Sequence, residues 1–150
     1  MAVVPLTAGQ QRAVDALVAA QDFRKVPADE TQARRFGEQA RLTLVDVPNV
    51  TQALNKYDLA YRAAHDVGEA MLRAYGYKNK WGPGAHERLA SFLAAIFDAP
   101  PPSEAAAHFE IMRSDRNDNH YKAVLVTQAA ADVAAEAART LYAAGPERLI

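Results

Sequence analysis

Cysteine is absent from this chain of 150 residues, and aromatic side chains make up only 8% of it. The first absence excludes disulfides, thiolate metal ligands and thiol catalysis, and it is compatible with a reducing compartment. The second favours close packing of small side chains over a bulky aromatic core. Because half of the residues are apolar and alanine is abundant, the composition indicates an all-α protein.

Excess charge and long apolar runs are also missing. The chain has 17 basic and 18 acidic residues, and its net charge of -1 provides no general attraction to nucleic acid or to an anionic membrane. Contact with nucleic acid would therefore need a local patch. No apolar run approaches the ~20 residues of a membrane span, and the N-terminal segment has no basic flank before an apolar stretch. We expect a cytoplasmic protein that does not enter a membrane.

Apolar residues at helical spacing predict two helices in the first third of the chain, at about residues 8–21 and 30–46. Thr7 precedes the first helix, and Gln10 follows it three residues later, which is the form of a capping box. Asp29 precedes the second helix, again with a glutamine three residues later. Both helices are thus expected to have capped starts.

Four further helices follow. The third is the longest, at about residues 50–75, with Asn49 as its candidate cap and Gly76 at its end. A short, strongly apolar fourth helix comes after a glycine-rich loop. The fifth opens at Ser103 after three prolines, and the last spans about residues 127–145. No strand pattern is visible.

Short connections between successive helices predict antiparallel neighbours. The expected architecture is all-α, an antiparallel up-and-down helical bundle at residues 49–150 with an N-terminal helical extension at residues 1–48. Together they form one compact domain. The alanine-rich last helix and the tyrosine-bearing third helix offer more apolar face than a small bundle covers. This surplus predicts a homodimer.

The sequence RSDRNDNHY, residues 113–121, places reactive side chains where a buried stripe would continue. The apolar face of the fifth helix is marked by Ala105, Phe109 and Met112. The same face is next occupied by Arg113, Arg116 and His120. Residues 117–119 are poor helix formers, so we expect the cluster at the mouth of the core. Two guanidiniums beside an imidazole can hold a phosphate and move a proton.

The longer pattern around this segment resembles the HEPN domain family. It consists of the long helix, a glycine loop followed by His86, a short helix, and RNDNHY before an alanine-rich closing helix. The resemblance covers about residues 50–144. It implies a small helical bundle that forms dimers and a metal-independent ribonuclease activity. It also implies a toxin role beside a minimal nucleotidyltransferase partner.

The HEPN motif is an arginine followed by a histidine after four to six residues. Arg113, with six residues before His120, satisfies the looser form. Arg116-Asn117 better resembles the arginine and polar start of the motif, but Tyr121 stands where its histidine would be. The resemblance implies catalytic roles for Arg113, Arg116 and His120, and binding roles for Asn117 and Tyr121.

RNA cleavage without a metal needs a base, an acid and cations around the phosphoryl group. His120 is the candidate acid or base, and Arg113 and Arg116 are the candidate cations. Because one chain supplies one such histidine, two copies across a twofold axis would complete the set. The alternative is a non-catalytic HEPN module that binds a nucleotide, RNA, or a nucleotidyltransferase or antitoxin partner.

The other histidines have structural interpretations as their default. His108 follows Glu104 by four residues, but the Glu-x-x-His pair typical of metal sites in bundles does not occur. We therefore expect no metal and no other cofactor. His65 is expected to be half-buried and hydrogen-bonded. His86 opens its helix, where a capping role is the default.

Two features of the third helix are likewise interpreted as structural. Asp58 and Arg62 are four residues apart and form a candidate ion pair on an exposed face. Tyr57 and Tyr61 are assigned to the core and to an interface.

The only tryptophan, Trp81, lies in the glycine loop near Lys78 and Lys80. It could stack on a base of a single strand. Anchoring of the loop is its more usual role.

Overall fold

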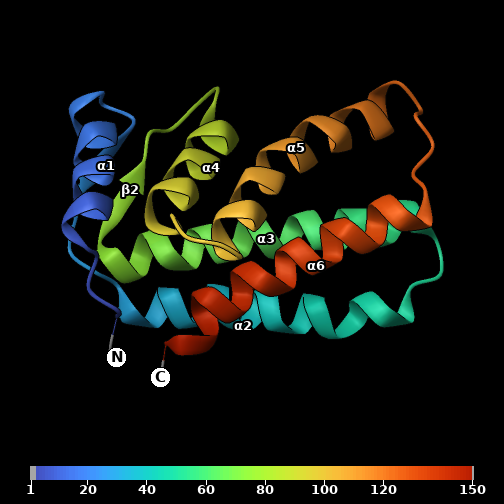
Figure 1. Ribbon diagram of the computed structural model, residues 1–150, viewed down its shortest axis with the longest axis horizontal. Helices are drawn as coiled ribbons and strands as arrows, with labels where there is room; N and C mark the ends of the chain where they lie inside the picture. Colours follow the sequence, from blue (N-terminus) through green and yellow to red (C-terminus); the bar gives the residue numbers. More distant parts are fainter. Residues whose placement is uncertain (1–2, 150) are drawn as a thin grey trace.

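The computed structural model describes residues 3–149, and within them six α-helices form a bundle (Figure 1). The helices are α1 (Ala8–Ala19), α2 (Glu30–Asp46), α3 (Ala53–Tyr75), α4 (Ala85–Ile96), α5 (Pro102–Tyr121) and α6 (Gln128–Ala144). Two short 3-10 helices, Val47–Asn49 and Pro146–Arg148, follow α2 and α6. The predicted all-α class is confirmed. No described helix combines the length and the apolar character needed to cross a bilayer.

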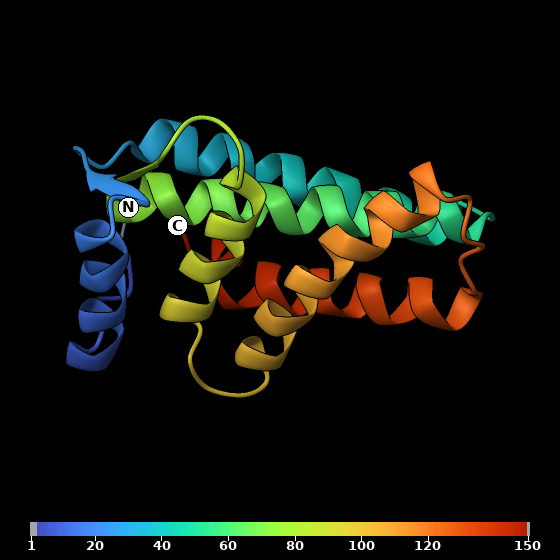
Figure 2. The same cartoon turned by 90° about the horizontal axis from the view of Figure 1, so that it is seen from above.

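The longest helix, α3, lies along both α2 and α6 (Figures 1 and 2). In Figure 1, α2 and α5 run from left to right, whereas α3 and α6 run in the opposite direction. The other three helices, α1, α4 and α5, lie above this layer in Figure 1, and α5 crosses it obliquely. The bundle therefore has a side on which α3, α4 and α5 converge.

The helix ends follow the local sequence in most places. Thr7 and Gln10 form the predicted capping box, with both reciprocal hydrogen bonds present. Asp29 caps α2 by accepting a hydrogen bond from the backbone of residue 32. Gly76 ends α3 in the left-handed conformation, at φ 79°. The candidate cap Asn49 is wrong, because Asn49 is part of a 3-10 helix and α3 begins at Ala53.

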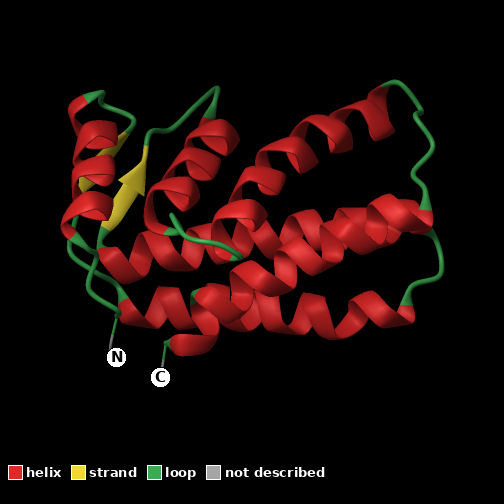
Figure 3. Cartoon of the chain, viewed as in Figure 1, coloured by secondary structure: helices red, strands yellow, loops and turns green. Residues whose placement is uncertain are grey.

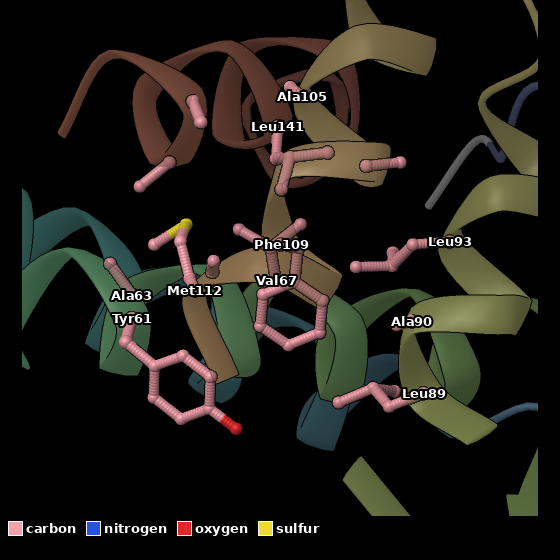
Figure 4. Packing of buried hydrophobic residues seen from close by; sticks show 14 of the residues in the cluster. Tyr61, Ala63, Val67, Leu89, Ala90, Leu93, Ala105, Phe109, Met112 and Leu141 are labelled. Carbon is pink, nitrogen blue, oxygen red and sulfur yellow. The ribbon is translucent and has the colours of Figure 1, made fainter. Parts of the chain in front are cut away.

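The core lies between α3 and the helices that cover it (Figure 4). Its largest fully buried side chains include Tyr57, Phe92, Phe109, Leu89, Leu93, Met112 and Leu141. Phe109 of α5 stacks on Tyr61 of α3, with ring centroids 5.5 Å apart. This contact brings α5 onto α3 at the edge of the core.

Two short strands, β1 (Phe23–Lys25) and β2 (Tyr77–Asn79), pair antiparallel (Figure 3). The expectation of no strand is therefore wrong. Segments of three residues are too short to show alternation, and β2 starts where Gly76 turns the chain away from α3. The pairing buries Phe23 and Tyr77, whose rings pack on Phe92 at centroid distances of 5.5 and 5.9 Å.

The apolar faces that predicted a homodimer are largely covered within the chain, although Ala130 and Val133 of α6 are exposed. The buried alanines of α6 are Ala131, Ala134, Ala135, Ala137 and Ala138. Tyr57 and Tyr61 are buried too. The exposed apolar side chains include instead Tyr121, Val124 and Leu125, at the end of α5 and in the loop that follows it. These faces therefore leave less apolar surface for a partner than the sequence predicted, and the dimer stays a prediction.

Gly68 sets the approach of α4 to α3. A Cβ at this position would lie 2.7 to 2.8 Å from the side-chain carbons of Leu89. We expect Gly68→Ala to lower the free energy of unfolding by about 1 to 2 kcal/mol, because overpacking outweighs the gain in helix propensity. Urea unfolding measures the change.

Gly9→Ala is the matched control, because a Cβ there meets no atom nearer than 3.8 Å. This variant should be as stable as the wild type or slightly more stable. Equal stability of Gly68→Ala and the wild type would contradict the close approach of the two helices.

Candidate functional site

The two halves of α5 have different environments. Its buried residues, Ala105, Ala106, Phe109 and Met112, all lie within its first eleven residues. None of the described residues after Met112 in this helix is buried. The helix continues through residues 117–119 and ends at Tyr121. The reactive segment thus lies at the mouth of the core, as predicted, but on a continuous helix.

Polar contacts to α3 hold the second half of α5. The hydroxyl of Tyr57 donates to Oδ2 of Asp115 over 3.0 Å, and burial is the main cause that raises the pKa of Tyr57. Asp58, one residue later on α3, is 2.9 Å from Nε2 of His120. These two contacts fix the side of α5 that faces α3.

Arg113 lies where α5 leaves the core. Its Nη2 is 3.2 Å from Oε1 of Glu87 on α4 and 3.6 Å from Oε1 of Glu110. Its Nε is buried and has no hydrogen-bond partner among residues 3–149. One donor of this guanidinium is therefore unused in the described part of the chain.

Arg116 lies one turn further along α5. Its guanidinium carbon is 5.3 Å from the centroid of the Tyr61 ring, and its Nε is 3.7 Å from Oδ1 of Asp58. The side chain is 44% exposed. A cation over an aromatic ring is held in place without losing its contact with water. Arg116 can therefore bind an anion from solvent.

Arg113, Arg116 and Asn117 share one hollow with residues of α3 and α4. The first hollow, as we call it, has a volume of about 130 Å³ and is lined by Tyr61, Gly84, His86, Glu87, Arg113, Arg116 and Asn117. Three of the five predicted site residues thus come together. The contributions of α3 and α4 were not predicted.

His86 is the histidine that lines the first hollow. Its Nδ1 is 2.7 Å from the hydroxyl of Tyr61. Burial, followed by the nearby His65, Arg113 and Arg116, lowers the pKa of His86 below its ordinary value, and burial raises the pKa of Tyr61. Near pH 7 the imidazole is thus neutral and Tyr61 keeps its proton. The direction of this hydrogen bond depends on the tautomer: when Tyr61 donates to Nδ1 the ring proton lies on Nε2, and when Nδ1–H donates to the Tyr61 oxygen Nε2 is free to accept a proton.

His120 and Tyr121 do not line the first hollow. Asp58 holds His120, with both carboxylate oxygens within 3.0 Å of Nε2. Tyr121 is the last residue of α5 and is 87% exposed. The predicted pair of Asp58 with Arg62 is not formed, because Asp58 turns to His120 and Arg116 instead. His120 thus lies outside the first hollow, although it shares Asp58 with Arg116.

A second hollow adjoins the first. It has a volume of about 360 Å³ and is lined by Asp58, Leu59, Tyr61, Arg62, His65, His86 and Arg116. Tyr61, His86 and Arg116 border both hollows. His65 lies beside His86, with ring centroids 5.0 Å apart. The two hollows therefore form neighbouring parts of one polar surface.

Sequence reasoning missed the roles of Tyr61, His86 and Asp58. For α3 a signal existed, because Asp58, Tyr61 and His65 lie three and four residues apart and share one helix face. For His86 no local pattern indicated a place beside the arginines of α5. His86 lies on α4, and only the packing of α4 against α5 brings it there. The predicted role of His86 as a cap is wrong: Gly84 is the N-cap, and no side chain caps α4.

Comparisons with protein-family models, with curated proteins and with solved structures found no match for the chain. Within residues 3–149 no group of three histidine, aspartate or glutamate side chains is placed to hold a metal ion. The groups that line the first hollow and can bind an anion or transfer a proton are two arginines, a tyrosine and a histidine.

The neutral state of His86 can be measured. We expect its imidazole to titrate by NMR below the ordinary pKa of 6.5, because burial and the nearby cations disfavour the charged ring. Arg116→Ala should raise the midpoint, since it removes a cation and exposes the ring. His86→Asn assigns the signal among the four histidines.

Arg139→Ala removes a cation that is ion-paired with Glu136 on α6, and it should leave the His86 midpoint unchanged. A wild-type midpoint at or above 6.5 would contradict the described environment of His86.

Proposed function

We propose that this protein is a metal-independent endoribonuclease of the HEPN type, in which Arg113 and Arg116 bind the phosphate that is cleaved. The observation that carries the proposal is the first hollow, where both guanidiniums lie beside a neutral histidine. The resemblance of residues 50–144 to the HEPN family adds support, since it places the same arginines in the active site. It also implies a toxin role with a nucleotidyltransferase partner.

The two arginines suit a phosphodiester. A guanidinium is planar and can donate two parallel hydrogen bonds to phosphate oxygens. Arg113 forms an ion pair with Glu87, whose Oε1 is 3.2 Å from Nη2 of the arginine. A bound phosphate would take the place of that carboxylate. Arg116 is already oriented by the Tyr61 ring. Asn117, one residue further, adds an amide that can donate to a phosphate or to a base.

His86 is the base in this proposal. In its neutral form it takes the proton of the RNA 2′-hydroxyl, O2′ attacks phosphorus, and the bond from phosphorus to O5′ breaks. The negative charge that builds on the phosphoryl oxygens is stabilised by Arg113 and Arg116. The Tyr61 oxygen accepts a hydrogen bond from Nδ1–H of His86, which orients the imidazole and leaves the lone pair of Nε2 free to take the 2′-hydroxyl proton. The products are a 2′,3′-cyclic phosphate and a 5′-hydroxyl.

His120 supplies the proton for the leaving O5′. Because it does not line the first hollow of its own chain, we assign it to the hollow of a second copy in a homodimer. Exposed Tyr121, Val124 and Leu125 lie directly after it and provide apolar surface for such a contact. Asp58 orients His120 in the free chain.

A second candidate function has one specific observation in its favour. Asp58 holds His120 away from the first hollow, and Tyr121 stands exposed at the histidine position of the Arg116 motif. On this alternative the protein is a non-catalytic HEPN module. It then binds RNA, a nucleotide, or a nucleotidyltransferase or antitoxin partner through the same arginines.

Cleavage of single-stranded RNA in excess chelator tests the proposal. Wild-type protein should cut the RNA, and His86→Ala should slow cleavage by about 10²- to 10⁴-fold, the usual contribution of a general base. Arg116→Lys should not restore the activity lost in Arg116→Ala, because a lysine lacks the planar fork. His108→Gln, at a histidine that lines neither hollow, should cut as fast as the wild type.

Mixing two inactive variants tests the composite site. In a dimer of Arg116→Ala with His120→Ala, one of the two sites is intact, so the mixture should recover about a quarter of the wild-type rate. No recovery would contradict the assignment of His120 to a second copy. RNA that binds to the arginines but stays intact with wild-type protein would favour the non-catalytic module.

A further inference from the structure

Trp81 is 95% exposed. It lies in the loop at residues 80–84, between β2 and α4, which rises to the edge of the molecule in Figure 1. The interpretation of Trp81 as an anchor of this loop is wrong, because an anchoring ring would be buried. A flat aromatic face is thus available to a ligand, and its surroundings decide which ligand it fits.

The loop keeps its shape without help from Trp81. Arg88 donates from Nη1 to the carbonyl of Pro83 over 2.8 Å and from Nη2 to the carbonyl of Lys80 over 2.7 Å. Its Nε donates to Oδ1 of Asn79 over 2.9 Å. The indole is therefore presented on a braced loop, which reduces the conformational entropy that a ligand must overcome.

Three cations gather on the outward face of the neighbouring β-ribbon. Arg24 of β1 is directly opposite Lys78 of β2. The backbone of Lys80 donates to the carbonyl of Asp22 over 3.0 Å and continues this pairing, so Lys80 projects to the same side as Lys78. None of the three cations forms an ion pair within residues 3–149. Like charges directly opposite each other destabilise a pair of strands. These cations therefore do not stabilise the ribbon and are available to bind an anion.

A third hollow joins these cations to the indole. The ribbon hollow, as we call it, has a volume of about 500 Å³, within the roughly 300–1,000 Å³ of small-ligand sites. Its charged lining consists of Arg24, Lys25, Lys78, Lys80 and a single acid, Asp22. A larger hollow on the same loop, about 740 Å³, includes Asp29 and Glu69 and so suits an anion less well.

We propose that Trp81 and the ribbon hollow bind single-stranded nucleic acid. A base stacks on the exposed indole, and the phosphates beside it contact Arg24, Lys78 and Lys80. Stacking of this kind tolerates any base, because every base has a π face, and the cations follow the backbone. The net charge of the chain gives no general attraction, so binding depends on this local patch.

The ribbon hollow is a separate site from the first hollow. The loop at residues 80–84 leads directly into α4, and the first hollow is lined by Gly84 at the end of the loop and by His86 in the first turn of α4. The two hollows have no lining residue in common. The proposal concerns binding alone and does not rest on cleavage.

The intrinsic fluorescence of the only tryptophan tests the proposal. The probe is an oligodeoxythymidylate of about eight nucleotides, within the roughly 4–16 that single-strand binding folds cover. It lacks the 2′-hydroxyl and cannot be cut by the proposed mechanism. We expect saturable quenching of Trp81. Lys78→Ala should reduce the slope of log K against log salt by about 0.7.

Anisotropy of a labelled strand tests the role of the ring. Trp81→Ala should weaken binding by about tenfold or more, whereas Trp81→Phe, which keeps a stacking face, should lose much less. Arg139→Ala removes a cation on α6 and should leave the affinity unchanged.

Absence of quenching at saturating oligonucleotide, or wild-type affinity in Trp81→Ala, would overturn the proposal. A blue shift of the emission with rising protein concentration alone would also overturn it, since the indole would then be covered by another copy of the chain. Quenching that persists in a protein without ribonuclease activity would support the ribbon hollow and contradict the proposed cleavage.

Discussion

The site depends on the position of Tyr61. Its ring stacks on Phe109 in the core at 5.5 Å, with an angle of 18° between the planes. Its ring also carries the guanidinium of Arg116, and its hydroxyl binds His86. One side chain thus joins the apolar core, the cationic face of α5 and the start of α4. Phe109 and Arg116 can converge on one tyrosine because they lie seven residues apart on the same face of α5.

Different forces position the two halves of α5. Buried apolar side chains as far as Met112 hold the first part of the helix, and polar contacts, most of them partly exposed, hold the rest. Contacts between partly exposed charges contribute roughly 0 to 1 kcal/mol each, so they orient side chains more than they stabilise the fold. An anion that replaces Glu87 or Asp58 on an arginine therefore costs little folding energy. This balance suits a surface that exchanges internal carboxylates for a phosphate.

Local patterns in the sequence predicted the features that are set by residues close to one another along the chain. Apolar spacing located the helices, Thr7 and Gly76 marked two of their ends, and the stripe that ends at Met112 predicted arginines at the mouth of the core. The ribbon of β1 and β2 was missed because strands of three residues carry no periodicity. His86 was missed because its place beside Tyr61 results from the packing of α4 on α3 at Gly68, which no local spacing encodes.

We infer that Arg113, Arg116 and His86 form one phosphate site on Tyr61. Titration with uridine 3′-monophosphate, followed by NMR of the arginine Nε and histidine ring signals, tests this claim most directly. We predict saturable shifts at Arg113, Arg116 and His86 with a common dissociation constant, and their loss in Tyr61→Ala. Shifts that leave His86 unmoved, or that persist unchanged in Tyr61→Ala, would contradict the account.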